Sequence, residues 1–111
     1  SNKTEAKLTE AVVNLEVVGQ LREHLDDNMV FEVYEEFEME TAILLEGIGS
    51  KDWDVIRSNL HTLKGNAATL GIDKVAKIAT LIEGNLKKKN TSNFDTDFFN
   101  LKNAFEEYKL S

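Results

Sequence analysis

The chain has 111 residues, of which 41% are hydrophobic, so one domain with one buried core is expected. Its net charge of -7 argues against duplex nucleic acid or an anionic membrane surface as a partner, and the absence of cysteine excludes disulfides, thiolate metal sites and thiol nucleophiles. No apolar run approaches the ~20 residues of a membrane span and no signal-peptide pattern is visible, so we expect a soluble cytoplasmic module.

The first part of the chain predicts a short N-terminal helical region. We expect a helical extension over residues 1–14, whose first two residues resemble a cloning scar, and a second short segment after it. Gly19 predicts a break between the two, because glycine weakens a helix interior and the apolar face changes there. The two apolar faces are formed by Leu8, Val12 and Leu15 and by Leu21 and Leu25.

Four longer segments follow, with apolar residues at the three- and four-residue spacing of amphipathic helices. Proline is absent, so nothing in them forces a break. Capping residues precede the first two, Asp73 opens the third, and Gly47 or Gly49 and Gly71 are the expected stops of the first and the second. The apolar stripes run over residues 30–48, 53–70, 75–86 and 94–108, and the candidate capping residues are Asp26 to Asn28 and Ser50 or Asp52.

Long helices joined by short loops pack as antiparallel neighbours. We therefore predict an all-α fold: an antiparallel up-and-down four-helix bundle over residues 15–110 with an additional short N-terminal helix. The whole chain, residues 1–111, is expected to form this single domain. We expect a monomer, because the pattern reveals no exposed apolar patch. A helical bundle hosts many functions, so the function has to be inferred from particular residues.

Few side chains remain that can do chemistry. The sequence has no nucleophile-elbow motif, no Glu-x-x-His pair for a di-iron site and no phosphate-binding loop. The two histidines are therefore the main candidates. His24 lies in REHLDDN near an expected helix end, which is typical of a partly exposed histidine in a C-terminal turn.

His61 has more unusual surroundings. At 100° per residue it falls outside the apolar stripe, with Gly65 and Ala68 on the same face. Glycine inside a helix costs about 1 kcal/mol relative to alanine, so the small strip favours a face that another surface approaches closely. Lys64 places a cation within reach of any group attached to the imidazole, which suits a phosphoryl group. Alternatively, His61 is a plain surface histidine and the small residues pack against a neighbouring helix.

Glu83 is predicted to lie beside His61. The helices before and after Gly71 should form an antiparallel hairpin, and positions 61 and 83 are equidistant from its turn. A carboxylate there would accept a hydrogen bond from Nδ1–H of His61, which fixes the tautomer and leaves Nε2 as the nucleophile. The alternative is an exposed Glu83 that pairs with Lys87 one helical turn later.

These residues form a pattern that resembles a known family. The sequence HTLKG at 61–65, the glycine at 71 and the Leu-Ile-Glu at 81–83 are similar to the motif of the histidine-containing phosphotransfer (Hpt) domain family. The resemblance extends over about residues 15–108 and includes the helix start GSKDW at 49–53. Two positions depart from the family pattern: Gly84 stands where a helix former is usual, and Leu60 replaces a small residue.

The resemblance implies a role for each site residue. His61 would be the phospho-acceptor, Lys64 would stabilise the phosphoryl group, Gly65 would give a receiver domain access, and Glu83 would orient the imidazole. The domain would accept a phosphoryl group from the aspartate of one receiver and pass it to another, without kinase activity of its own. The partners would be receiver domains of response regulators or hybrid sensor kinases. The domain needs no cofactor of its own, and the receiver would supply Mg²⁺.

Two other functions remain open from the sequence. A substrate domain of a chemotaxis-type kinase, phosphorylated directly by a catalytic domain, shares the same motif. A pure interaction bundle would never carry phosphate on His61, although the four intact site residues argue against it.

Overall fold

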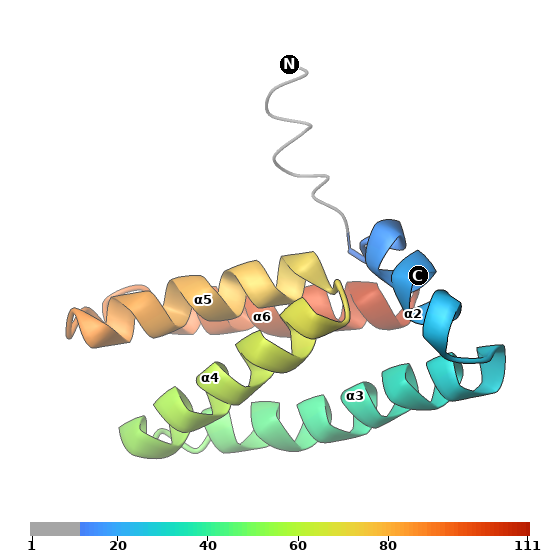
Figure 1. Ribbon diagram of the computed structural model, residues 1–111. Helices are drawn as coiled ribbons and strands as arrows, with labels where there is room; N and C mark the ends of the chain where they lie inside the picture. Colours follow the sequence, from blue (N-terminus) through green and yellow to red (C-terminus); the bar gives the residue numbers. More distant parts are fainter. Residues whose placement is uncertain (1–11) are drawn as a thin grey trace.

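The computed structural model describes residues 12–111, and these form five helices and no strand. A short helix, α2, precedes four long helices, and successive long helices run in opposite directions (Figure 1). The predicted all-α class and the order of one short helix followed by a bundle are confirmed. The helices are α2 (Leu15–His24), α3 (Asp27–Ile48), α4 (Trp53–Thr69), α5 (Asp73–Lys87) and α6 (Phe94–Lys109).

Acidic residues cap α3 and α4 at their N-termini. Asp26 Oδ1 accepts a hydrogen bond of 2.9 Å from the N–H of Met29 at the start of α3. Asp52 Oδ1 accepts bonds of 3.1 and 3.4 Å from the N–H groups of Asp54 and Val55 at the start of α4. These bonds satisfy donors that have no partner inside the helix. Of the two capping candidates before α4, Asp52 fills the role.

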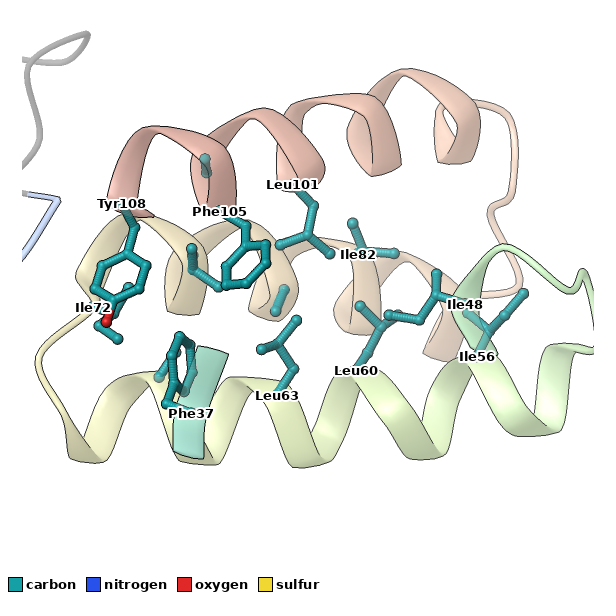
Figure 2. Close-up of a cluster of buried hydrophobic side chains, with 14 of the residues drawn as sticks. Phe37, Ile48, Ile56, Leu60, Leu63, Ile72, Ile82, Leu101, Phe105 and Tyr108 are labelled. Carbon is teal, nitrogen blue, oxygen red and sulfur yellow. The ribbon is translucent and has the colours of Figure 1, made fainter. Parts of the chain in front are cut away.

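The core lies between α3, α4, α5 and α6, and it fixes the rotation of each helix (Figure 2). Leu60 and Leu63 of α4 are fully buried, as is Leu101 of α6. Phe37 of α3 makes an edge contact with Tyr108 of α6, with ring centroids 5.6 Å apart. Because neighbouring residues on a helix point about 100° apart, burial of Leu60 turns position 61 out of the core.

Gly71 joins α2 to the rest of the bundle at the turn between α4 and α5. Its φ of +70° lies in the left-handed region that favours glycine. The N–H of Asn14 donates a 2.6 Å hydrogen bond to the carbonyl of Gly71, and the Asn14 side chain donates one of 3.2 Å to Asp73. A Cβ on Gly71 would lie 2.8 Å from Cβ of Val17. This glycine therefore ends α4 and also lets α2 dock closely.

The predicted break at Gly19 is wrong, because α2 continues through it. A Cβ at Gly19 would meet nothing within 4 Å, so the only cost there is the low helix propensity of glycine. The expected extension over residues 1–14 falls mostly outside the described residues. Within them, Val12 and Val13 are not helical, and the side chain of Asn14 caps α2 through Glu16 N–H at 3.0 Å.

The surface is also more apolar than the sequence pattern indicated. Leu15 and Phe31 are 79% and 66% exposed, and they border an apolar groove between α2, α3 and α6 that also includes Tyr34. Trp53, expected in the buried stripe of α4, is 44% exposed. The helical projection failed here because it assigns a face to each helix but does not show where the neighbouring helices stop covering it.

Candidate functional site

His61 lies midway along α4, on the side that faces α5 and solvent. Its side chain is 71% exposed, whereas the preceding Leu60 and the nearby Leu63 are fully buried. The anchored neighbours hold the backbone at position 61, so the imidazole extends from a rigid helix. An accessible imidazole on a rigid element is a suitable nucleophile for group transfer.

Glu83 reaches His61 from the adjacent helix α5. Its Oε2 lies 2.9 Å from Nδ1 of the imidazole, as the hairpin geometry indicated. The residue is only 7% exposed, so the carboxylate is held among neighbouring side chains. An ionised carboxylate only accepts hydrogen bonds, so Nδ1 carries a proton, and in the neutral imidazole the lone pair then lies on Nε2. The pair therefore selects one tautomer of the neutral ring.

The second oxygen of the same carboxylate binds Lys64. Nζ of Lys64 lies 2.5 Å from Oε1 of Glu83, and the lysine side chain is 29% exposed. Burial alone would raise the pKa of Glu83. The hydrogen bonds from Lys64 and His61, together with the charges of Lys64 and Lys87, outweigh burial and lower this pKa. Glu83 is therefore held in its ionised form.

The structure decides between the alternatives for Glu83 and for the small strip. Glu83 is buried and binds His61 and Lys64, so the exposed Glu83–Lys87 pair is wrong. Gly65 and Ala68 are exposed, and a Cβ on Gly65 would meet nothing within 4 Å. Packing of this strip against a neighbouring helix is therefore wrong as well. The strip is open surface beside the imidazole.

The two departures from the family pattern, Gly84 and Leu60, are both accommodated by the helices. Gly84 directly follows Glu83, yet α5 continues through it to Lys87. Leu60 occupies the place of a small residue and is fully buried in the core. The other histidine, His24, is exposed at the end of α2, outside the group formed by His61, Lys64 and Glu83.

The site contains two cations that the sequence did not identify as functional. A hollow of about 390 Å³ beside His61 is lined by Arg57 of α4 and Lys87 of α5, together with Asp54, Ser58, Thr62 and Glu83. Both cations stand four residues before or after a site residue, which is one helical turn. That spacing is a signal available in the sequence, but on an exposed helix face it is also typical of ordinary solvated charges.

No group of three or more His, Cys, Asp or Glu side chains that could hold a metal ion occurs within residues 12–111. None of the helices α2 to α6 is long and apolar enough to cross a lipid bilayer.

A helical bundle that presents an exposed histidine, held by a buried carboxylate, can offer a nucleophile to a partner. In a comparison with family models, the model of the Hpt domain matches residues 15–109. The chain belongs to the Hpt domain family. Members of this family take part in histidine phosphotransfer in phosphorelays with receiver domains and have no kinase activity of their own. Searches among curated proteins and among solved structures gave no match.

The ionised state of Glu83 predicts a pH-dependent contribution to stability. Its folded pKa lies below the ordinary value of 4.5, so the contribution is present above about pH 4.5 and is lost as the pH falls through the lower folded pKa. The difference in free energy of unfolding between wild type and Glu83→Gln should therefore shrink on acidification below pH 4.5. Urea unfolding at a series of pH values measures it.

An exposed carboxylate provides the matched control. Glu106→Gln removes the same charge from α6, where Glu106 pairs with Lys109 at 2.9 Å on the surface. A wild-type advantage over Glu83→Gln that stays constant through the acid range would show that the carboxylate charge is not what stabilises the site.

Proposed function

We propose that this domain accepts a phosphoryl group on Nε2 of His61 from the phosphoaspartate of one receiver domain and passes it to the aspartate of another. The observation that carries the proposal is the exposed imidazole whose Nδ1 is held 2.9 Å from the buried carboxylate of Glu83. This arrangement leaves Nε2 without a hydrogen bond to Glu83, on a side chain that is exposed to a partner protein. The proposal includes the expected monomer and the expected cytoplasmic location.

The transfer step follows from the tautomer. The lone pair on Nε2 of His61 attacks the phosphorus, the N–P bond forms, and the bond between phosphorus and the aspartyl oxygen breaks. The donor aspartate leaves as a carboxylate. The imidazole keeps its Nδ1 proton and gains positive charge, which the Glu83 carboxylate stabilises across the hydrogen bond. The reverse step, with a second receiver aspartate as nucleophile, discharges the histidine.

Lys64 is positioned to act on the phosphoryl oxygens. Its ammonium already lies at the site, bound to Oε1 of Glu83, and its Cα is three residues from His61 on the same helix. A phosphoryl group on Nε2 introduces a stronger anion close to this ammonium. A change of side-chain rotamer then moves Lys64 from the carboxylate toward the phosphate, while Oε2 of Glu83 stays with the imidazole.

The receiver completes the site. Gly65 leaves the surface beside His61 open, so the receiver backbone can approach the imidazole. We assign the Mg²⁺ that neutralises charge during transfer to the receiver, in keeping with the usual division of labour in phosphoryl transfer. The Hpt domain supplies the positioned nucleophile, its orienting carboxylate and one cation.

His61→Gln tests the assignment of the acceptor. The variant should take no phosphoryl group from a phosphorylated receiver. Among the described residues, no other exposed histidine has its Nδ1 bound by a carboxylate. Its free energy of unfolding should stay within about 0.5 kcal/mol of wild type, because position 61 is exposed. A radiolabelled transfer assay that scores acid-labile, base-stable phosphate measures the first property, and urea unfolding measures the second.

His24→Gln is the matched control and should transfer as wild type does. Acid-labile phosphate on His61→Gln at the wild-type rate would remove His61 from the mechanism. Its loss in His24→Gln would move the acceptor to the other histidine.

Gly65→Gln separates folding from docking. Glutamine is a much better helix former than glycine, and a Cβ at this position meets nothing within 4 Å, so stability should rise by about 0.5–1 kcal/mol. The same side chain would occupy the surface next to His61 and should slow transfer from the receiver. A melting curve and a transfer time course on the same protein measure both effects.

Gly19→Gln is the control for this variant. It makes the same change on α2, where a Cβ also meets nothing within 4 Å, and it should gain stability without any effect on transfer. Normal transfer by a stable Gly65→Gln would show that the open strip is not used for docking. A strongly destabilised Gly65→Gln would show that the glycine serves the helix itself.

A further inference from the structure

A second surface, built without the helices that carry His61, combines exposed apolar side chains with a groove. At one end of the bundle, α2, the start of α3 and the C-terminal end of α6 leave an apolar groove of about 690 Å³ between them (Figure 1). None of the described residues that line it comes from α4 or α5, the helices of His61, Lys64 and Glu83. A partner in this groove would therefore leave the imidazole accessible.

The two tyrosines of the groove have their hydroxyl groups bonded within the protein. The Tyr34 hydroxyl donates a 2.7 Å hydrogen bond to the carbonyl of Leu70, and the Tyr108 hydroxyl donates one of 3.3 Å to Oε2 of Glu38. Since both donors are used, these residues offer a ligand mainly ring surface. Phe31 also lines the groove and is largely exposed. The groove is therefore suited to apolar side chains of a partner.

The apolar surface continues from the groove along α3. Phe31, Met39 and Ile43 are each at least 66% exposed, and positions four residues apart form one ridge along a helix. Glu35 lies on that ridge between Phe31 and Met39. Both methionines of the chain, Met29 and Met39, are exposed on this helix. Methionine is flexible and polarisable, so it adapts well to the surface of a partner.

The same helix carries the whole of the chain's excess negative charge. Seven of the 20 Asp and Glu residues lie in α3, together with none of the 13 Lys and Arg residues, so the remaining 13 acidic residues equal the 13 basic ones. Within residues 12–111, the one ion pair that α3 makes joins Asp27 to Arg22 at 3.2 Å. Glu32 and Glu35, next to Phe31 on the helix surface, are exposed carboxylates outside that pair.

This combination of apolar and acidic surface determines the chemistry of the partner. A symmetric pair of copies would place the same patch on both sides of the interface, so the carboxylates of two α3 helices would meet. Like charges across an interface cost free energy, and an anionic membrane surface would be repelled in the same way. A helix with an apolar stripe and Lys or Arg on its polar face satisfies both features, because its stripe fills a groove while its cations pair with carboxylates.

We propose that the groove between α2, α3 and α6, together with the exposed ridge of α3, binds a basic amphipathic helix of a partner protein. The apolar side chains of that helix enter the groove beside Phe31, and its cations lie against Glu32 and Glu35. The site is separate from the face proposed for phosphoryl transfer, so this partner and a receiver bind at the same time. Such a partner holds the phosphocarrier in place without covering His61.

The experiment measures binding of a model helix to the full chain. The probe is a fluorescein-labelled peptide of about 18 residues with Leu on one face and Lys on the other, and the control probe has Glu in place of every Lys. At physiological ionic strength the anisotropy of the Lys probe should rise to saturation at one peptide per chain. The Glu probe should bind at least about tenfold more weakly, because its charge has the same sign as that of α3.

Phe31→Ser tests the apolar part of the site and should weaken binding of the Lys probe about tenfold, because a central aromatic anchor is lost. Leu15→Ser, a second variant in the groove, should weaken it as well. Phe99→Ser is the matched control: Phe99 of α6 is exposed but does not line the groove, so binding should stay within about twofold of wild type. All three positions are exposed, so the variants should melt close to wild type.

Glu32→Gln/Glu35→Gln tests the electrostatic part. At low ionic strength this variant should bind the Lys probe about tenfold more weakly than wild type, and the difference should shrink as salt is added. Asp95→Asn/Glu107→Gln is the matched control, because it removes two exposed carboxylates from α6 that do not line the groove. Its binding should stay within about twofold of wild type.

A competition experiment tests whether the site is separate from His61. A phosphorylated receiver that transfers to the wild-type protein should do so at the same rate when the Lys probe is saturating. Slower transfer, or release of the probe by the receiver, would assign the groove to receiver docking and overturn the proposal.

Four further outcomes would overturn it. The first is absence of saturable binding of the Lys probe, and the second is equal binding of the Glu probe. The third is a loss in either α6 control as large as that in the matching groove variant, because binding would then reflect general surface character. The fourth is a dimer in sedimentation equilibrium that Phe31→Ser dissociates, because a second copy would then occupy the groove.

Discussion

The site depends on one carboxylate that binds two partners at once. Oε2 of Glu83 lies 2.9 Å from Nδ1 of His61, and Oε1 binds the ammonium of Lys64. A buried carboxylate without partners would cost several kcal/mol and would tend to be protonated. Here the two contacts keep it ionised. The negative charge in turn fixes the tautomer of the neutral histidine, so the same interaction contributes to the stability of the fold and, in the proposed function, leaves Nε2 as the reactive nitrogen.

The rest of the bundle serves to bring this carboxylate to the histidine. Gly71, in its left-handed conformation, ends α4 and turns the chain back into α5. Burial of Leu60 on α4 and Ile82 on α5 rotates each helix so that the next residue along, His61 or Glu83, points toward the other helix. The core thus determines the distance between the imidazole of His61 and the carboxylate of Glu83.

Much of this arrangement could be predicted from the sequence because it depends on local periodicity and on one short turn. The apolar stripes gave the helices, and the hairpin symmetry about residue 72 placed Glu83 beside His61. The bond between Lys64 and Glu83 was missed, because a helical projection does not show which of several nearby partners a long side chain selects. A break was predicted at Gly19 because glycine has a low helix propensity. The N-terminal cap of α2 and the contacts that dock this helix on the bundle offset that low propensity and could not be seen in the sequence.

Features that depend on where helices diverge could not be predicted from the sequence. The exposed Leu15 and Phe31 border a groove that forms where three helices leave space between them, and no single helix pattern contains that information. Arg57 and Lys87 looked like ordinary solvated charges until the structure brought them together around His61. The hollow beside the imidazole is therefore a property of the assembled bundle.

The central claim is that Glu83 holds the proton on Nδ1 and leaves Nε2 of His61 to carry the phosphoryl group. Nitrogen-15 NMR of the phosphorylated, histidine-labelled protein tests it most directly, because coupling to phosphorus identifies the bonded nitrogen. The account predicts coupling to Nε2 of His61, with Nδ1 still protonated and hydrogen-bonded to Glu83. Coupling to Nδ1, or phosphate on any other residue, would contradict it.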